Sequence, residues 1–395
     1  MIALRLHRLL ARGLVIGLAA GIWLPLAAAA QDVAGQALHQ AARNNDAELA
    51  AFALERGADI ELRDQLGNTP LLVSAMFGSP AVAELLLRSG ADPAAATPDD
   101  NWTALHFAAY EGYDRVAKAL IAGGAPLDAR EGNHGNTPLH LAARRLKRPV
   151  VAALLSAGAP VDARDGSDGN TALINAAFDD QGTSVVAELL AGGADPSLAA
   201  ADGTTALIAA ARAGADGSLQ LLIGAGADAT ARRRDGWSAL HLAAAYGHTT
   251  LIAPLLAAGI PVDQQAAEGE TALGQAIEAG QIDTVIALLE AGADANRPGR
   301  SGRPPVVLAA AAGQPAALYI LLNRGADPDA RETGSGNTAL MLAANRARLK
   351  AVELLLQAGA DVGLTASDGW TALAAAEMIG DSEIAALLRA AGAAE

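Results

Sequence analysis

The stretch Gly135-Asn136-Thr137-Pro138-Leu139-His140-Leu141-Ala142-Ala143 decides the fold of this chain, because versions of it recur along the whole 395-residue sequence. Successive copies are 33 or 34 residues apart, and a period of this length is typical of stacked-repeat proteins. One copy begins with Pro304, and the other copies begin with Thr or Ser at Thr69, Thr103, Thr137, Thr171, Thr205, Ser238, Thr271, Thr338 and Thr371.

Each copy predicts two short helices. A Gly, or Asn101 in one copy, stands two residues before the Thr, where a turn with positive φ is expected. The Thr hydroxyl then provides an N-cap, and Pro or Ala begins the first helix. The second helix carries Val and Leu at helical spacing and ends in Gly-Ala-Asp or a close variant, as at Gly90 and Gly226. Helices this short are unstable alone, so neighbouring copies must stack.

These residues resemble the ankyrin repeat family, whose T-P-L-H-x-A signature and Gly-Ala-Asp cap recur here in register over nearly all of residues 31–395. The resemblance implies an all-α solenoid of about eleven helix-turn-helix units with hairpin-like finger loops. We expect one ankyrin repeat domain at 31–395, with an N-terminal capping repeat at 31–66, nine internal repeats at 67–368 and a C-terminal capping repeat at 369–395. The first repeat is degenerate, because Gln36 replaces its Thr.

Residues 1–30 have the layout of a secretory signal peptide. Basic residues come first, an apolar stretch follows over 14–26, and Ala28-Ala29-Ala30 precedes Gln31. A membrane anchor is the alternative, but the stretch is short and Pro25 interrupts it. We therefore expect cleavage after Ala30 and a periplasmic or secreted protein. The chain has no Cys, which excludes disulfides and thiolate metal sites.

Composition and charge limit the classes of partner that the chain can bind. The net charge is −15, and a negative surface repels nucleic acid and anionic lipid, so we expect neither nucleic acid nor membrane binding after signal cleavage. The chain is 52% hydrophobic but only 3% aromatic, which suits closely packed short helices. We expect a monomer that binds a protein partner.

No pattern of residues predicts an enzyme, a cofactor site or a metal site. The family resemblance gives His39, His106, His140 and His241 a structural hydrogen bond to a neighbouring turn. His248 stands at a capping place, and only His134 has no obvious structural role. Residues 334–339, Gly-Ser-Gly-Asn-Thr-Ala, imitate a dinucleotide fingerprint but lack the strand and helix around it.

Two local features stand out from the repeat. Three long fingers, at 130–135, 164–169 and 331–336, are rich in Gly, which suits either partner contact or plain turn chemistry. Pro254 falls inside a second helix, where it is expected to cost about 3 kcal/mol and to kink the chain near residues 250–256.

The resemblance places partner binding on a concave groove lined by the fingers and the first helices. The corresponding positions are the residue before Thr and the two residues before the turn between helices, and they hold seven of the eleven aromatic residues beyond the signal. Aromatic residues and Arg are common anchors of interfaces. We expect a main patch at Phe77, Trp102 and Tyr110 and a second near Trp237 and Tyr246. The full candidate set is Phe77, Trp102, Tyr110, Glu111, Arg144, Arg145, Phe178, Trp237, Tyr246 and Arg346. The alternative for the Trp residues is that they pack on the turn.

The sequence therefore predicts a non-enzymatic scaffold for protein–protein interaction. It resembles the bacterial periplasmic ankyrin proteins, some of which are associated with catalase and peroxide defence, and this implies an oxidative-stress enzyme as partner. Two alternatives remain: a secreted effector that engages host proteins, and an accessory to an enzyme.

Overall fold

The computed structural model describes residues 23–394, which fall into two compact units divided between Gly132 and Asn133. We call residues 23–132 the N-terminal unit and residues 133–394 the C-terminal unit. Most of the expected signal peptide lies outside the described residues, and α2 (Trp23–Asn44) runs past the expected cleavage site at Ala30. Within the described range, none of the helices combines the length and apolar character that crossing a membrane requires.

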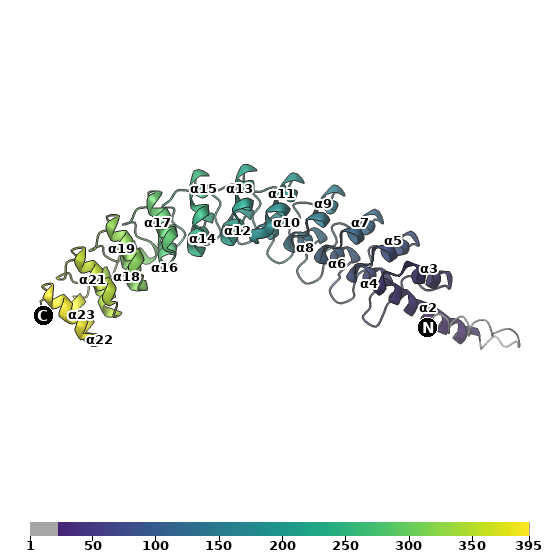
Figure 1. Cartoon of the computed structure of the whole chain (residues 1–395), viewed down its shortest axis with the longest axis horizontal. Helices are drawn as coiled ribbons and strands as arrows, with labels where there is room; N and C mark the ends of the chain where they lie inside the picture. Colours follow the sequence, from purple (N-terminus) through teal and green to yellow (C-terminus); the bar gives the residue numbers. More distant parts are fainter. Residues whose placement is uncertain (1–22, 395) are drawn as a thin grey trace. The chain divides into compact units, whose positions relative to one another are not determined.

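The N-terminal unit consists of three helix pairs. Its first helices are α2, α4 (Pro70–Met76) and α6 (Ala104–Glu111), and its second helices are α3 (Ala47–Glu55), α5 (Pro80–Arg88) and α7 (Asp114–Ala122). Figure 1 shows the first helices in one row and the second helices in another. The core lies between the rows, where Leu72, Leu86, Leu105 and Leu120 are fully buried.

The C-terminal unit repeats this arrangement eight times (Figure 1). Its first helices are α8 (Pro138–Arg144), α10 (Ala172–Ala177), α12 (Ala206–Ala213), α14 (Ala239–Tyr246), α16 (Ala272–Glu278), α18 (Pro305–Ala312), α20 (Ala339–Asn345) and α22 (Ala372–Ile379). Its second helices are α9 (Arg148–Ser156), α11 (Thr183–Ala191), α13 (Asp216–Gly224), α15 (Ile252–Ala257), α17 (Ile282–Glu290), α19 (Pro315–Asn323), α21 (Leu349–Gln357) and α23 (Ser382–Ala390). The prediction of an all-α array of eleven helix pairs is confirmed for the described residues, where β-structure is limited to isolated bridges.

The predicted cap and turn chemistry explains where the helices begin. The Thr69 hydroxyl accepts a hydrogen bond from the backbone N–H of Leu72, and the Thr171 hydroxyl does the same for Ile174. Every Gly two residues before a motif Thr, Ser or Pro has positive φ, and Asn101 adopts the same conformation at φ 56°. At Gly236 a side chain is also excluded by contact, because a Cβ there would lie 2.5 Å from the backbone nitrogen of Ala267.

The motif His residues join each unit to its finger loop, as expected. In His106, Nδ1 lies 3.1 Å from the backbone nitrogen of Thr103 and accepts its hydrogen bond, while Nε2 lies 3.1 Å from the carbonyl oxygen of Ala129. A carbonyl only accepts, so Nε2 carries the proton. His39 also reaches a carbonyl, that of Leu62, at 2.8 Å, but its Nδ1 has no partner. The Thr that would supply one is replaced by Gln36.

Successive fingers are connected by backbone hydrogen bonds near their tips. In the C-terminal unit these bonds run from the N–H of Gly166 to the carbonyl of His134 at 2.7 Å, and from Ala267 to Asp235 at 3.1 Å. Between the fingers at 264–270 and 297–303, an ion pair of Arg300 with Glu268 at 2.6 Å joins the tips. The fingers therefore form a continuous hydrogen-bonded row within the unit.

The structure corrects the expected cost of Pro254. A 3-10 turn at Thr249–Leu251 begins the helical segment, and Pro254 is the third residue of α15. The first N–H groups of an α-helix have no partner in the helix, so the missing donor of Pro254 costs little. The predicted irregularity is present, but it lies before the proline. A second 3-10 turn, at Asp180–Gly182, contains the extra residue of its repeat.

Candidate functional site

The candidate surface is formed by three positions of each repeat, which we call the first-helix face: the residue before the motif Thr and the two residues before the turn between helices. Phe77 is 54% exposed, Tyr246 is 50% exposed and Phe178 is 40% exposed. Trp102, Tyr110 and Trp237 are half-buried, although the sequence suggested that they are exposed. Their rings pack on neighbouring side chains of the same repeat and remain partly exposed.

Trp102 is the centre of an aromatic cluster in the N-terminal unit. Its ring centroid lies 5.0 Å from that of Phe107, 5.7 Å from that of Tyr110 and 5.9 Å from that of His106. The Trp102 and Tyr110 rings meet edge to face, a favourable arrangement for aromatic pairs. Trp102 and Tyr110 were predicted to lie together, and the structure brings them into contact.

Sequence reasoning missed Phe107. This residue follows His106 in the motif, a position that Val73 and Leu141 fill with buried side chains. The larger Phe ring is half-buried and reaches the Trp102 ring. An aromatic residue at a position where the other copies hold Val, Leu, Ala, Asn or Gln was the available signal.

Phe77 extends the N-terminal surface by one repeat. It is the C-cap residue of α4, which packs beside α6, and Glu111 occupies the same repeat position at the end of α6. Phe77 makes no ring contact with the Trp102 cluster among the described contacts, so the predicted patch has two parts on neighbouring first helices. Glu111 is exposed beside them.

The second predicted patch is built around Tyr246. The His248 ring stacks on the Tyr246 ring at 6.2 Å with an interplanar angle of 15°, and the Arg212 guanidinium lies 5.9 Å from the centre of the Tyr246 ring. His248 stands at the predicted capping place, as the N-cap residue of the 3-10 turn at Thr249–Leu251, but its side chain makes no cap hydrogen bond. Its Nε2 instead lies 3.0 Å from the Arg212 carbonyl oxygen, and its ring lies over Gly214.

Trp237 supports the packing interpretation better than the anchor interpretation. Its ring is half-buried and tilted against that of His241, with 6.0 Å between centroids. Burial lowers the pKa of His241, so its imidazole is neutral at pH 7 and acts as a structural group.

The remaining candidates are exposed but do not form one cluster. Arg144 and Phe178 occupy the same repeat position on the neighbouring helices α8 and α10, and Arg145 lies beside Arg144. Arg346 stands at the end of α20, far along the unit. The same positions in the last repeat hold Met378 and Ile379, which are 67% and 40% exposed and were not among the residues predicted from the sequence.

Charged side chains of the long fingers make hydrogen bonds to the backbone of their own finger or of the next one. Asp165 accepts hydrogen bonds from the backbone N–H groups of Asp168, Gly169 and Asn170 at 2.8–3.2 Å. Arg331 donates to the carbonyl oxygens of Gly336 at 3.4 Å and Thr365 at 2.7 Å. These contacts support the turn-chemistry interpretation of these side chains.

Two finger carboxylates have altered acidity. Burial raises the pKa of Glu332, but hydrogen bonds and charge from Arg303, with hydrogen bonds from Ser335 and Asn337, outweigh it, so its pKa lies below the usual value. Burial also opposes ionisation of Asp202, and hydrogen bonds from the Thr204 backbone and hydroxyl, with the charge of Arg233, bring the pKa of Asp202 below its usual value. Both groups stabilise finger conformation.

The described residues contain no group of three His, Asp or Glu side chains placed to hold a metal ion. His134, the loop His without an assigned role, has Nδ1 3.1 Å from the hydroxyl of Ser167 in the next finger.

Comparison with known proteins agrees with this architecture. A family model described as ankyrin repeats (3 copies) matches residues 23–97, 89–165, 207–299 and 306–394. The chain is similar to the mouse cyclin-dependent kinase 4 inhibitor B, with 41% identity over 76 residues, 19% of this chain and 58% of that protein. It is similar to the mouse protein phosphatase 1 regulatory subunit 27, with 40% identity over 63 residues, 16% of this chain and 41% of that protein.

A third relative is the rice probable E3 ubiquitin-protein ligase XBOS31, which is 36% identical over 77 residues, 20% of this chain and 17% of that protein. The matches thus cover less than two thirds of each of these relatives. The helix pairs, the His-to-finger hydrogen bonds and the family match over most of its length show that this chain belongs to the ankyrin repeat family.

Proposed function

We propose that the protein is a non-enzymatic scaffold that binds a protein partner through its first-helix face. The observation that carries this proposal is the half-buried cluster of Trp102, Phe107 and Tyr110, with Phe77 exposed on the next helix. Rigid aromatic side chains that keep one edge in solvent bury large apolar area on binding at low cost in conformational entropy.

Two further observations support the proposal. The motif His residues and the finger carboxylates are occupied by structural hydrogen bonds, as His106 and Asp165 show. The names of two relatives describe an inhibitor of a kinase and a regulatory subunit of a phosphatase, which are proteins that act on other proteins. A regulator that works by contact rather than by catalysis fits this chain.

The proposed location is the periplasm or the exterior of the cell, on the basis of the signal-like sequence at residues 1–30. The resemblance to periplasmic ankyrin proteins supports an oxidative-stress enzyme as the partner. Cell fractionation tests the location. Periplasmic retention is expected, release into the medium would favour the secreted effector, and a cytoplasmic full-length chain would overturn the export proposal.

Site-specific photo-crosslinking in the native cell tests the binding surface. A photoreactive phenylalanine analogue replaces Phe77 in one variant and Phe52 in a control, and mass spectrometry identifies the adducts. Phe52 is 45% exposed on α3, a second helix, so both probes are accessible aromatic positions. One protein crosslinked at Phe77 and absent at Phe52 is expected. Equal crosslinking at both positions, or none at Phe77, would contradict the proposal.

A further inference from the structure

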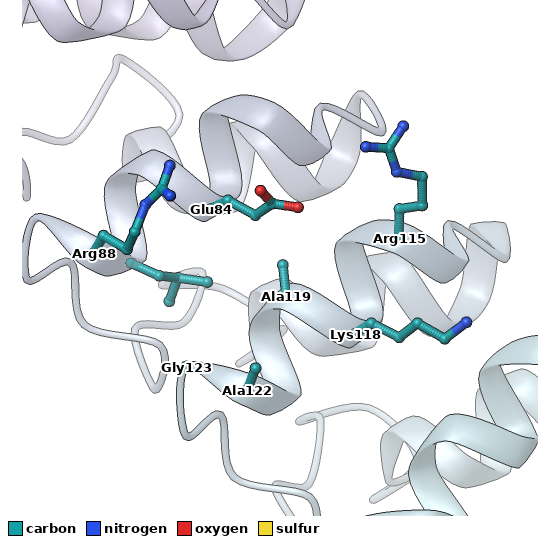
Figure 2. A pocket seen from close by; sticks show the side chains of 8 residues that line it. Glu84, Arg88, Arg115, Lys118, Ala119, Ala122 and Gly123 are labelled. Atoms are coloured by element: carbon teal, nitrogen blue, oxygen red, sulfur yellow. The ribbon is translucent and has the colours of Figure 1, made fainter.

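The second-helix side of the N-terminal unit carries an open groove between α5 and α7. Its volume is about 600 Å³, and it is lined by Glu84, Leu87, Arg88, Arg115, Lys118, Ala119, Ala122 and Gly123. This size lies in the range of binding sites for small segments and ligands. Figure 2 shows Glu84 and Arg88 on one helix and Arg115, Lys118, Ala119 and Ala122 on the other, around the space.

Small residues on α7 create the groove. Ala119, Ala122 and Gly123 occupy positions that Leu85, Arg88 and Ser89 fill one repeat earlier. The Leu87 side chain lies directly over Gly123, where a Cβ would come within 2.7 Å of it. The floor is therefore apolar and partly open, with Leu87 and Ala119 half-buried and Ala122 exposed.

The charge of the groove is opposite to that of the chain. The chain has 28 basic and 43 acidic residues, yet the groove is lined by three cations and one carboxylate. Lys118 pairs with Asp114 at 2.9 Å. Within the described residues, no ion pair involves Arg88, Arg115 or Glu84, and all three are exposed. Two guanidinium groups without a carboxylate partner border an apolar floor.

We propose that this groove binds an extended acidic segment of a partner protein, on a surface separate from the first-helix face. Guanidinium groups bind carboxylates through paired hydrogen bonds, and the apolar floor receives a side chain between the two acidic residues. Charge complementarity favours this occupant over a basic or a purely apolar one.

The positions of the two arginines give the spacing of the segment. Arg88 is the last residue of α5 and Arg115 is the second of α7, so in repeat register they are about 10 Å apart along the helices and about 10 Å across them. The diagonal of roughly 14 Å corresponds to about four residues of extended chain. Side chains i, i+2 and i+4 of an extended segment share one face.

The segment therefore has acidic residues at i and i+4 and an apolar residue at i+2. Glu84, which lies between the two arginine side chains in Figure 2, repels a carboxylate at that central position. The expected pattern is Glu-x-Leu-x-Glu, with Leu over Leu87 and Ala119.

The test is a titration of the full chain with capped synthetic peptides. Binding is monitored through the methyl NMR signals of Leu87, Ala119 and Ala122. The probes are Glu-Ser-Leu-Ser-Glu, a shuffled peptide Glu-Glu-Ser-Ser-Leu of equal composition, and Lys-Ser-Leu-Ser-Lys. Saturable shifts with the first peptide are expected, with weaker binding to the shuffled one and none to the basic one. Binding should weaken as NaCl rises from about 0.05 to about 0.5 M.

Substitutions test whether the peptide binds in the groove. Arg88→Glu with Arg115→Glu should weaken binding at least about tenfold, since each change removes one ion pair and adds a repulsion. Arg234→Glu with Arg348→Glu, which alters charge equally at exposed sites elsewhere, should leave binding within about twofold. Ala122→Leu, which keeps every charge but fills the floor, should also abolish the shifts. Absent shifts, equal shifts for all three peptides, or unchanged binding in Ala122→Leu would overturn the proposal, whatever the first-helix face does.

Discussion

The Nε2 atom of His241 lies 3.1 Å from the backbone carbonyl oxygen of Glu270, the residue before the Thr of the next repeat. On its other side, Nδ1 accepts a hydrogen bond from the backbone N–H of Ser238, with 3.3 Å between the two nitrogen atoms. The ring is thus a buried link between two repeats, and both of its nitrogen atoms are satisfied only when the imidazole is neutral.

This link predicts a pH dependence. Burial lowers the pKa of His241 in the folded chain, while the unfolded chain keeps a value near 6.5. Below that value the unfolded state binds more protons, so stability is lost as pH falls from about 7 towards 5. The protection factors of amides 264–271, which correct for the intrinsic pH dependence of hydrogen exchange, should fall over this range.

The variant His241→Gln should lower the protection of amides 264–271 at neutral pH and make that protection less dependent on pH. The corresponding amides at 364–371 follow a repeat in which Met341 replaces the motif His, and they provide an internal comparison. Equal loss of protection at both segments in the wild-type chain would show that His241 is not the responsible group.

Glu332 is an acid, whereas His241 is a base, but its contribution to the stability of the folded state is also lost as pH falls. The folded-state pKa of Glu332 is lowered, so its contribution is complete above the usual value near 4.5 and is lost as pH falls below it. Glu332→Gln weakens the contacts with Arg303 and Ser335 and should cost about 1 kcal/mol, because Arg303 remains 40% exposed.

Glu268→Gln is the matched control for Glu332→Gln. Glu268 pairs with Arg300, but both side chains are more than half exposed, so we expect a stability change near zero. Urea unfolding measures both variants. Equal losses would mean that burial of the Glu332 carboxylate has no part in its contribution.

Two glycines with similar backbone angles separate conformational strain from contact. Gly236 has φ 82° and Gly359 has φ 85°, but a Cβ at Gly359 meets nothing within 4 Å. Gly359→Ala should cost about 1 kcal/mol from strain alone. Gly236→Ala should cost clearly more, because the added methyl group displaces Ala267 and its hydrogen bond to Asp235. Thermal unfolding of the pair checks the order, and equal costs would contradict the contact argument.

Pro254→Ala should not stabilise the protein. The proline is the third residue of α15 and withholds no hydrogen bond that the α-helix needs, while its removal loosens the unfolded chain. We expect a melting temperature that is unchanged or lower by a few degrees, at about 0.4–1 kcal/mol. Leu255→Ala, at a fully buried neighbour, should cost about 2–5 kcal/mol in the same assay. A clear gain for Pro254→Ala would restore the strained-helix interpretation.

The fold could be predicted from the sequence because the motif residues of each repeat have local structural roles that their positions indicate. Thr69 caps a helix, Gly236 adopts positive φ and His140 reaches the carbonyl oxygen of Ala163 at 2.9 Å, each as its position in the motif predicted. Each of these interactions is made within one repeat or with the next repeat. The repeat period alone therefore predicts which two residues interact. The extent of the domain and the signal peptide remain predictions.

The candidate surface was predicted less completely, because it depends on contacts between side chains of different size. The sequence analysis made no prediction for position 107, and only the structure shows the Phe107 ring reaching Trp102. The groove between α5 and α7 could not be predicted from the sequence for a similar reason. Ala119, Ala122 and Gly123 define an empty volume only when Leu87 of the neighbouring helix is in place.

The measurement that tests the central claim most directly is partner binding by the variant Phe77→Ala with Tyr110→Ala, using the protein identified by crosslinking at Phe77. Both side chains belong to the first-helix face, and Phe52→Ala on a second helix is the control. The account predicts at least about tenfold weaker binding for the double variant, from two aromatic anchors of about 1 kcal/mol or more each, and unchanged binding for the control. Equal affinity of the double variant and the wild-type chain, with the fold intact by circular dichroism, would contradict it.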